Sequence, residues 1–308
     1  MKIAVVGAGA VGATTAYALM TGHLVNELVL VDINRARAEG EAMDIADGMA
    51  FVGPVSVYAG DYADCAGAGV VILAAGANQR PGESRLDLVQ RNMDVVRQVC
   101  RELSRYWQGG VLLVVTNPVD ILTYAAQRFT GLPPEMVIGS GTVLDSARFR
   151  KYLSRHCGVD GRNVHAYVVG EHGDTEVFLW SRATIAGVNV DEFCDLRGVP
   201  RPDRKVMADL VRNSAAEIIA RKGATYYGVS LAVRRICEAV LRNQQSVLTV
   251  SGPLDGPYGL TGVACSIPSV VGRNGRERIL ELPLAPNEEG ALRHSAGVLK
   301  KVQQDVGL

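Results

Sequence analysis

The chain has 308 residues, 48% of them hydrophobic, and its 32 Lys and Arg residues balance its 32 Asp and Glu residues. This length allows one large domain or two ordinary ones with a well-buried core, which excludes an intrinsically disordered chain. No block of like charge and no basic stripe with interleaved aromatic residues occurs, so we expect neither nucleic acid nor a membrane as a partner.

Six cysteines are scattered along the chain without a paired spacing: Cys65, Cys100, Cys157, Cys194, Cys237 and Cys265. This distribution favours buried thiols in a reducing compartment over a disulfide framework or a metal site. The N-terminus superficially resembles a secretory signal, but cleavage after residues 16–18 would remove the first predicted strand and its glycines. We therefore expect a cytoplasmic protein without a metal.

The first informative motif is a glycine-rich turn near the N-terminus. An apolar run at 3–6 leads directly into Gly7 to Gly12, and the stretch 11–20 can form a helix. A second apolar run, 28–31, ends at Asp32, twenty residues after the last glycine. Strand, glycine turn, helix and acidic residue in this order are typical of a site for a dinucleotide.

Each of these residues has a separate role in such a site. Gly7 permits the tight turn, Gly9 lets the backbone approach the pyrophosphate, and Gly12 lets the helix pack on the strand. Asp32 would accept hydrogen bonds from the ribose diol and would repel a 2′-phosphate, which favours NAD. The nearby Arg35 keeps NADP open as an alternative.

Short runs of Val, Ile, Leu and Ala recur between stretches with helical spacing, at 3–6, 28–31, 55–58, 70–74 and 111–115. Buried parallel strands have this pattern, so we expect an α/β, doubly wound parallel sheet of the Rossmann type over residues 1–140. Beyond it, helices mix with alternating segments at 246–251 and 263–271. This change predicts an α+β catalytic domain over 141–308.

The last predicted helix covers about residues 287–305. Glu288 and Glu289 near its start and Lys300 and Lys301 near its end suit the helix macrodipole. Its apolar stripe is expected to be structural.

Two segments of the second half contain candidate catalytic residues. His172 lies between small residues in the segment 170–174, and histidine is the natural proton carrier near neutral pH. Asp145 and Arg148 are three residues apart on a predicted helix that starts after residues 139–142, so they share one face. A hydrogen-bonded structural histidine and a simple salt bridge are the alternatives at this point.

Six ordered motifs make the whole chain resemble the L-2-hydroxy-acid dehydrogenases, and more narrowly the bacterial L-lactate dehydrogenases. They are the glycine turn with Asp32, residues 78–86 (Asn-Gln-Arg-Pro-Gly-Glu-Ser-Arg-Leu), 117–120 (Asn-Pro-Val-Asp), 145–148, 170–174, and 222–227 (Lys-Gly-Ala-Thr-Tyr-Tyr). The resemblance implies that these segments converge on one substrate, pyruvate or L-lactate.

Residue by residue, the resemblance assigns four catalytic roles. It makes His172 the acid/base, with Asp145 orienting it, Arg148 binding the substrate carboxylate and Arg85 polarising the carbonyl. The substrate pocket that it implies also contains Gln79, Asn117 and Thr225. The implied NAD-binding residues are Gly7, Gly9, Val11, Gly12, Asp32, Asn117 and Ser140.

Specificity is expected to depend on Gln79. Malate enzymes similar to this chain carry arginine two residues before the loop proline, where this chain has Gln79. A neutral amide offers no countercharge to the second carboxylate of oxaloacetate, and Glu83 adds negative charge to the loop. Arg80 would supply the missing charge if the loop register shifted, so a malate dehydrogenase stays the nearest alternative.

Regulation and assembly come from the resemblance alone. Arg150 and His165 match positions similar to the fructose 1,6-bisphosphate site of allosteric bacterial lactate dehydrogenases, although both could be ordinary surface or interface residues. The resemblance also implies a homotetramer. An alternative from another class is a non-catalytic NAD-binding module, against which the set of His172, Asp145, Arg148 and Arg85 argues.

Overall fold

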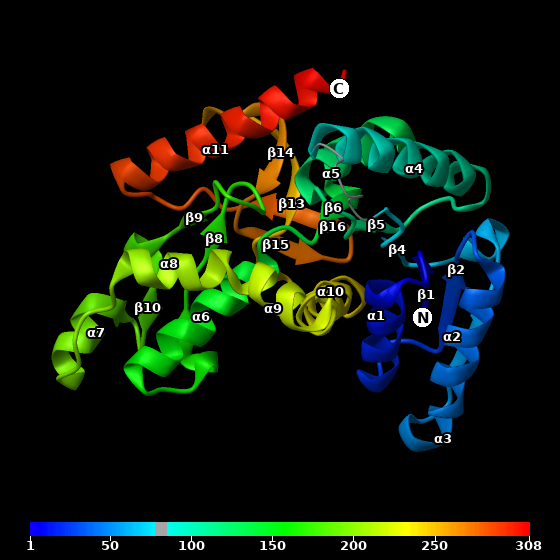
Figure 1. Ribbon diagram of the computed structural model, residues 1–308, viewed down its shortest axis with the longest axis horizontal. Coiled ribbons are helices and arrows are strands. Elements are labelled where there is room, and N and C mark those ends of the chain that lie inside the picture. Colours follow the sequence, from blue (N-terminus) through cyan, green and yellow to red (C-terminus); the bar gives the residue numbers. More distant parts are fainter. Residues whose placement is uncertain (78–84) are drawn as a thin grey trace.

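The computed structural model describes residues 1–77 and 85–308, with only the backbone of residue 85. The first half alternates strands with helices (Figure 1). Its strands are β1 (Lys2–Val6), β2 (Glu27–Val31), β3 (Ser56–Ala59), β4 (Val70–Leu73), β5 (Val111–Val114) and β6 (Val137–Gly139). Its helices are α1 (Ala10–Thr21), α2 (Arg35–Asp47), α3 (Met49–Val52), α4 (Arg85–Tyr106) and α5 (Val119–Thr130), with short 3-10 turns η1 (Tyr62–Cys65) and η2 (Pro134–Met136).

These six strands form a parallel sheet in the order β6-β5-β4-β1-β2-β3. The chain order reverses between β1 and β4, and ligands of such sheets bind at this point, beyond the carboxyl ends of the strands. The predicted doubly wound parallel sheet is confirmed.

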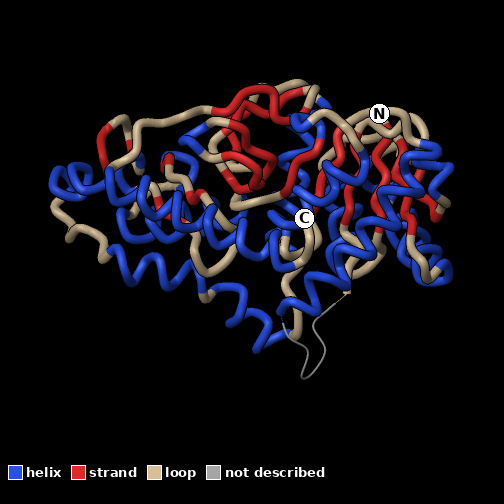
Figure 2. The backbone as a smooth tube through the Cα atoms, turned by 90° about the horizontal axis from the view of Figure 1, so that it is seen from above, coloured by secondary structure: helices blue, strands red, loops and turns tan. Residues whose placement is uncertain are grey.

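Alternation along β1 shows why helices cover both faces of the sheet. Ile3 and Val5 pack in a core shared with α1, α2 and α10, whereas Ala4 and Val6 pack in a second core shared with α4 and α5. Seen from above, the strands lie between two helical layers (Figure 2). A strand buried on both faces must be apolar throughout, which explains the unbroken Val/Ile/Leu runs.

The second half mixes short strands with helices. Its strands are β7 (Val164–His165), β8 (Val168–Val169), β9 (Val177–Phe178), β10 (Thr184–Ile185), β11 (Val188–Asn189), β12 (Ser246–Leu248), β13 (Ser251–Asp255), β14 (Thr261–Ser266), β15 (Ser269–Gly272) and β16 (Gly275–Ile279). Its helices are α6 (Val143–Cys157), α7 (Val190–Arg197), α8 (Arg204–Arg212), α9 (Ser214–Lys222), α10 (Tyr227–Leu241) and α11 (Pro286–Asp305), with 3-10 turns η3 (Gly161–Asn163), η4 (Trp180–Arg182) and η5 (Pro257–Gly259). The predicted α+β character of this half is confirmed.

Both predicted alternating segments are broken in the structure. The segment 246–251 divides into β12 and the start of β13, and 263–271 divides into β14 and β15, which belong to different sheets. The second break falls at Pro268, which has no N–H to continue the ladder. As a result, β13 and β14 add to the first-half sheet as antiparallel strands beyond β6.

The cysteines and the C-terminal helix agree with the predictions. All six cysteines are buried free thiols, and burial raises the pKa of Cys65 and Cys100 to about 12. Helix α11 starts one residue before the predicted helix and ends at the predicted residue. Among the described residues, no helix is long and apolar enough to cross a membrane.

Candidate active site

The glycine turn after β1 has the geometry that its sequence predicts. Gly7 has φ +105°, and a Cβ there would lie 2.4 Å from the backbone nitrogen of Ala75. A Cβ on Gly12 would lie 1.8 Å from the carbonyl oxygen of Gly7, whereas a Cβ on Gly9 would meet no atom within 4 Å. Two of the glycines are therefore required by the protein's own packing, and Gly9 faces open space that a ligand can use.

A cleft of about 470 Å³ opens beside this turn, and its lining includes Gly9, Asp32, Ile33 and Tyr62. No side chain caps the N-terminus of α1 and no acidic residue occupies its first turn, which contains Val11. The free N–H groups and the positive end of the helix suit a pyrophosphate, so the residues present fit NAD.

Asp32 lies at the carboxyl end of β2, where the ribose is expected. Its carboxylate accepts hydrogen bonds from the backbone N–H groups of Ala8, at 2.6 Å, and Asn34, at 2.8 Å. Arg35 is held by ion pairs to Glu39 and Asp61. The guanidinium that would favour NADP is thus already neutralised.

Sequence reasoning missed Ile33, which lines this cleft. Its side chain is fully exposed although it directly follows a buried strand. An exposed isoleucine at the rim of a cleft offers an apolar surface to a flat aromatic ring. The available signal was the apolar residue immediately after Asp32.

Asn117 and Ser140 follow the carboxyl ends of the neighbouring strands β5 and β6. The carbonyl of Asn117, which precedes a cis proline, accepts a hydrogen bond of 2.9 Å from the side chain of Asn92. The Asn92 side-chain oxygen accepts the N–H of Ala77 at 2.7 Å, so this buried residue of α4 connects two loops at the cleft. No local pattern in the sequence points to Asn92, because its partners lie on other elements.

The loop of residues 170–175, named the catalytic loop after the candidate residue His172, connects β8 to β9 and places His172 against α6. His172 Nδ1 lies 2.5 Å from one carboxylate oxygen of Asp145, and Arg148 donates to the other oxygen at 2.9 Å. Asp145 is buried, the Arg148 side chain is 11% exposed and the His172 side chain is 27% exposed. The structure therefore contains the i, i+3 salt bridge, with the histidine added as a third member.

Electrostatics favour a charged imidazole in this arrangement. Burial alone would lower the pKa of His172, but the charge and the hydrogen bond of Asp145 raise it to about 9. Burial opposes ionisation of Asp145 in turn, yet His172 and Arg148 hold its pKa below the usual range. These interactions therefore favour the protonated form of the His172 ring at neutral pH.

The catalytic loop is anchored from three further elements. The carboxylate of Asp120, on α5, accepts the backbone N–H of His172 at 2.8 Å. Ser295, on α11, accepts the N–H of Glu171 at 2.8 Å, and Gly170 pairs with the backbone of Ser266 at the end of β14. Asp120 belongs to a motif that the sequence highlighted without assigning it a role, and Ser295 carried no local signal.

A cavity of about 370 Å³ brings Arg148 together with Thr225. Lys222 and Tyr226 also line it, and the ammonium of Lys222 lies 3.4 Å from the centre of the Tyr226 ring. Gln79, Arg80 and Glu83 and the side chain of Arg85 lie outside the described residues.

The two residues of the expected effector site lie on adjacent elements. Arg150 is on α6, where its Nε–H contacts the carbonyl of Ser146 at 3.4 Å, and burial lowers the pKa of its guanidinium. His165 is exposed on β7, which packs against α6.

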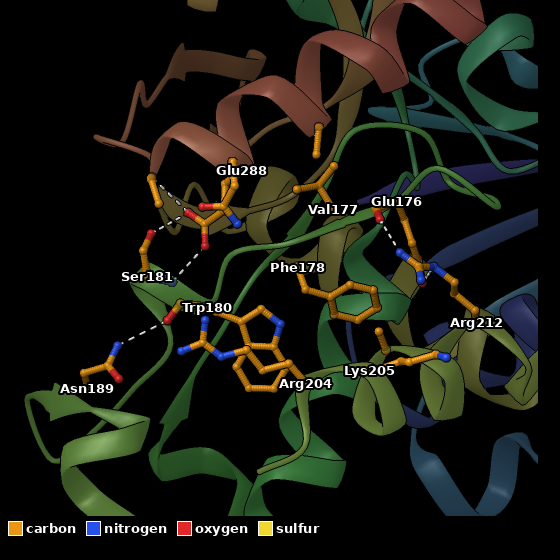
Figure 3. Close-up of a pocket in the computed structure, with 14 residues that line it drawn as sticks. Glu176, Val177, Phe178, Trp180, Ser181, Asn189, Arg204, Lys205, Arg212 and Glu288 are labelled. Carbon is orange, nitrogen blue, oxygen red and sulfur yellow. Dashed lines mark hydrogen bonds and ion pairs between the residues drawn. The ribbon is translucent and has the colours of Figure 1, made fainter. Parts of the chain in front are cut away.

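Another groove lies between α8 and the start of α11 (Figure 3). Glu176, which lines it, is buried, and burial together with the negative charge of Asp145 raises its pKa to about 8. Arg212 donates to the backbone carbonyl of Glu176 at 2.9 Å and lies over the ring of Phe178. This acid was not identified from the sequence.

Comparisons with known proteins agree with this architecture. Residues 1–139 match the NAD binding domain of lactate/malate dehydrogenase, and residues 142–307 match the alpha/beta C-terminal domain of the same family. An L-lactate dehydrogenase of Acetivibrio thermocellus is 54% identical over 98% of this chain and 96% of its own. Another, of Moorella thermoacetica, is 53% identical over 100% of this chain and 98% of its own.

Solved structures give the same result. The ligand-bound crystal structure of a minor L-lactate dehydrogenase from Enterococcus mundtii has a TM-score of 0.96 and 45% identity, covering 99% of this chain and 98% of that one. A lactate dehydrogenase from a Medee basin deep-sea metagenome library has a TM-score of 0.96 and 41% identity, covering 100% of this chain and 99% of that one.

The fold and the glycine-lined cleft define an NAD-dependent oxidoreductase. The domain matches and full-length relatives make the assignment narrower. The chain belongs to the lactate/malate dehydrogenase family.

Proposed function

We propose that this protein is an L-lactate dehydrogenase, which reduces pyruvate to L-lactate reversibly, with His172 as the acid/base. The observation that carries the proposal is the Asp145 carboxylate, shared between His172 and Arg148. This arrangement places a proton donor and a carboxylate-binding cation on the same anchor. Reduction of a 2-keto acid needs both groups.

Each side chain has a defined task in this reaction. Bound NADH supplies the hydride for the carbonyl carbon. His172 gives its proton to the keto oxygen, and Asp145 holds the ring in the correct tautomer and stabilises its charged form. Arg148 binds the substrate carboxylate, since a guanidinium has five N–H donors and the bond to Asp145 leaves others available. In lactate oxidation the neutral His172 accepts the hydroxyl proton.

The remaining site residues complete the reaction and the binding of substrate. Arg85 polarises the carbonyl, Gln79 sets the preference for a methyl group over a second carboxylate, and Asn117 and Thr225 belong to the substrate pocket. The cofactor is held by Gly7, Gly9, Val11, Gly12, Asp32, Asn117 and Ser140. These roles rest on the family motifs. The cleft beside Gly9 and the shared cavity of Arg148 and Thr225 support them.

Initial rates of NADH oxidation with pyruvate and with oxaloacetate test the substrate. We expect a strong preference for pyruvate and, in Gln79→Arg, a shift toward oxaloacetate because the new cation pairs with the second carboxylate. Preference of the unmodified enzyme for oxaloacetate would make it a malate dehydrogenase. A Gln79→Arg enzyme that still strongly prefers pyruvate would show that another residue sets specificity.

Regulation and assembly form a separate part of the proposal. We propose a homotetramer in which Arg150 and His165 bind fructose 1,6-bisphosphate, because an arginine and a histidine on adjacent elements suit phosphate groups. The sugar then activates by binding the active state more tightly. Pyruvate saturation curves with and without the sugar should differ, and superimposable curves would refute the effector site.

We also propose a division into a cofactor domain, residues 1–140, and a catalytic domain, residues 141–308, in a cytoplasmic enzyme that reoxidises NADH during fermentative glycolysis. Family matches that end at residue 139 and restart at residue 142 support the boundary. Limited proteolysis with and without NADH would test it, because cleavage should concentrate in connections between compact units.

A further inference from the structure

Asp120 is a buried carboxylate that the proposed reaction does not use. It lies in the first turn of α5 with 2% of its surface exposed. One carboxylate oxygen accepts the backbone N–H of His172 at 2.8 Å, and the other accepts the hydroxyl of Ser251, on β13, at 2.6 Å. Both oxygens thus have donors from segments far away in the chain.

These two bonds give Asp120 an unusual place in the architecture. Helix α5 follows β5 and the Asn117 turn at the cofactor cleft, whereas the catalytic loop follows β8 in the second half. Asp120 is therefore a direct link between the part of the chain that forms the cofactor cleft and the backbone of the catalytic histidine. Desolvation of a carboxylate is costly, so a neutral residue would serve better if only packing mattered.

We propose that Asp120 is a positioning residue for His172, which fixes the backbone of the histidine relative to the cofactor cleft and places a second negative charge beside its ring. The inference rests on the proposed role of His172 as the acid/base. Asp145 then controls the ring through Nδ1, and Asp120 controls the main chain that carries the ring. Two carboxylates on two different helices hold one residue.

The charges around both groups agree with this arrangement. His172 is faced by Asp145 on α6, Asp120 on α5 and Glu176 beyond the loop, and each of them raises the pKa of the imidazole. Burial raises the pKa of Asp120 to about 6, against the hydrogen bonds of Ser251 and His172. Asp120 is consequently ionised at pH 8, where its charge acts on His172.

The groups facing Asp120 are equally defined. Glu171, on the catalytic loop, opposes its ionisation, and the positive charge of His172 favours it. Cys265, on β14, feels the charge of Asp120 and stays a protonated thiol, because burial holds its pKa far above neutrality. Among these neighbours, His172 is therefore the group whose charged form the Asp120 carboxylate stabilises.

Asp120→Asn separates charge from geometry. The asparagine oxygen can still accept the N–H of His172, and its amide can donate to Ser251, so both contacts persist without the charge. With ¹³C-labelled histidine rings, NMR titration follows the five histidines, and His172→Asn identifies the signal of His172. We expect the pKa of His172 to fall by about half a unit to one unit in Asp120→Asn, with the alkaline limb of pyruvate reduction moving equally.

Glu288→Gln is a matched control. Glu288 is also a buried carboxylate, and it accepts the backbone N–H and the hydroxyl of Ser181 (Figure 3) together with the backbone N–H of Ala285 at the start of α11. The same chemical change should therefore lower the melting temperature and leave the pKa of His172 unchanged. An equal fall of that pKa in both variants would overturn the specific role of Asp120.

Ser251→Ala removes one anchor of the carboxylate without replacing any ionisable residue. We expect kcat for pyruvate to fall about three- to tenfold at pH 8, with the dissociation constant of NADH within twofold of the unmodified enzyme. An unchanged kcat in Ser251→Ala, or an unchanged pKa of His172 in folded Asp120→Asn, would contradict the inference. If Asp120→Asn does not fold, Ser251→Ala alone decides.

The two proposals can fail separately. Full turnover in His172→Asn would refute the acid/base role regardless of Asp120. A lower pKa of His172 in Asp120→Asn, with the pH profile of turnover unmoved, would support the contact and refute the role of His172 in the reaction. Full loss of NADH binding in Asp120→Asn or Ser251→Ala would show a structural defect in the cleft and overturn the positioning role.

Discussion

The glycine turn and the catalytic loop are built in opposite ways. The turn depends on steric contacts of its backbone, of Gly7 against Gly12 and against Ala75, and its acidic partner Asp32 bonds to Ala8, 24 residues away. Residues of the loop bond to Asp145, Asp120 and Ser295, which are 27, 52 and 124 residues away from their partners.

The contrast explains how each region responds to change. The turn is constrained by the close packing of its backbone, so substitutions there should affect folding and cofactor binding. The loop is held by tertiary hydrogen bonds and charges, so substitutions there should affect proton transfer. Substitutions in the two regions should therefore separate stability from chemistry.

The largest effect is expected for His172→Ala. Removal of an acid/base group typically costs ~10²–10⁴-fold in rate. NADH binding, measured by fluorescence titration, should stay within about twofold, because the cofactor cleft beside the glycine turn is unchanged. Undiminished turnover in His172→Ala would overturn the proposal that the loop supplies the acid/base residue.

Asp145→Asn should have the next largest effect. Without the carboxylate charge, the pKa of His172 should fall from about 9 toward its ordinary value of 6.5. The protonated fraction of His172 at pH 7.5 would drop from nearly all to about a tenth. This change alone lowers the rate of pyruvate reduction about tenfold. Stopped-flow measurement of the chemical step checks this, and a loss that is the same at pH 6 and pH 9 would argue against a protonation effect.

Gly12→Ala tests the steric region, with Gly9→Ala as its control. A methyl group on Gly12 collides with the Gly7 carbonyl, and we expect a loss of about 2–3 kcal/mol in the free energy of unfolding. The methyl group of Gly9→Ala points into open space, so stability should be retained while NADH affinity falls. Denaturant unfolding and NADH titration of both variants give the answer. Equal stability losses would mean that Gly9 is also a packing position.

The smallest effect is expected for Ser295→Ala. It leaves the buried N–H of Glu171 without its serine acceptor, at a cost of about 1–2 kcal/mol in unfolding free energy. Turnover should fall only a fewfold, because Asp145 and Asp120 still hold His172. A loss of turnover as large as that of Asp145→Asn would show that α11, and not the pair of carboxylates, sets the position of the loop.

The same contrast sets the limit of prediction from sequence. Gly7, Gly12 and the apolar strands were predictable because steric fit and burial on both faces impose local patterns. The boundaries of β12 to β15 were not, since strand pairing across the molecule and Pro268 divide what looks like continuous alternation. Asp120, Asn92 and Glu176 act through partners on other elements, so no spacing along the chain could reveal their contacts.

The pH dependence of the forward and reverse reactions tests the central claim most directly. With His172 as the proposed acid/base, the ring is protonated for pyruvate reduction and neutral for lactate oxidation, so kcat/KM for pyruvate should fall as pH rises through about 9. Over the same interval, kcat/KM for lactate should rise to a plateau. Profiles that are flat between pH 7 and 10, or that change in the same direction for both substrates, would contradict the account of His172 as the proton carrier.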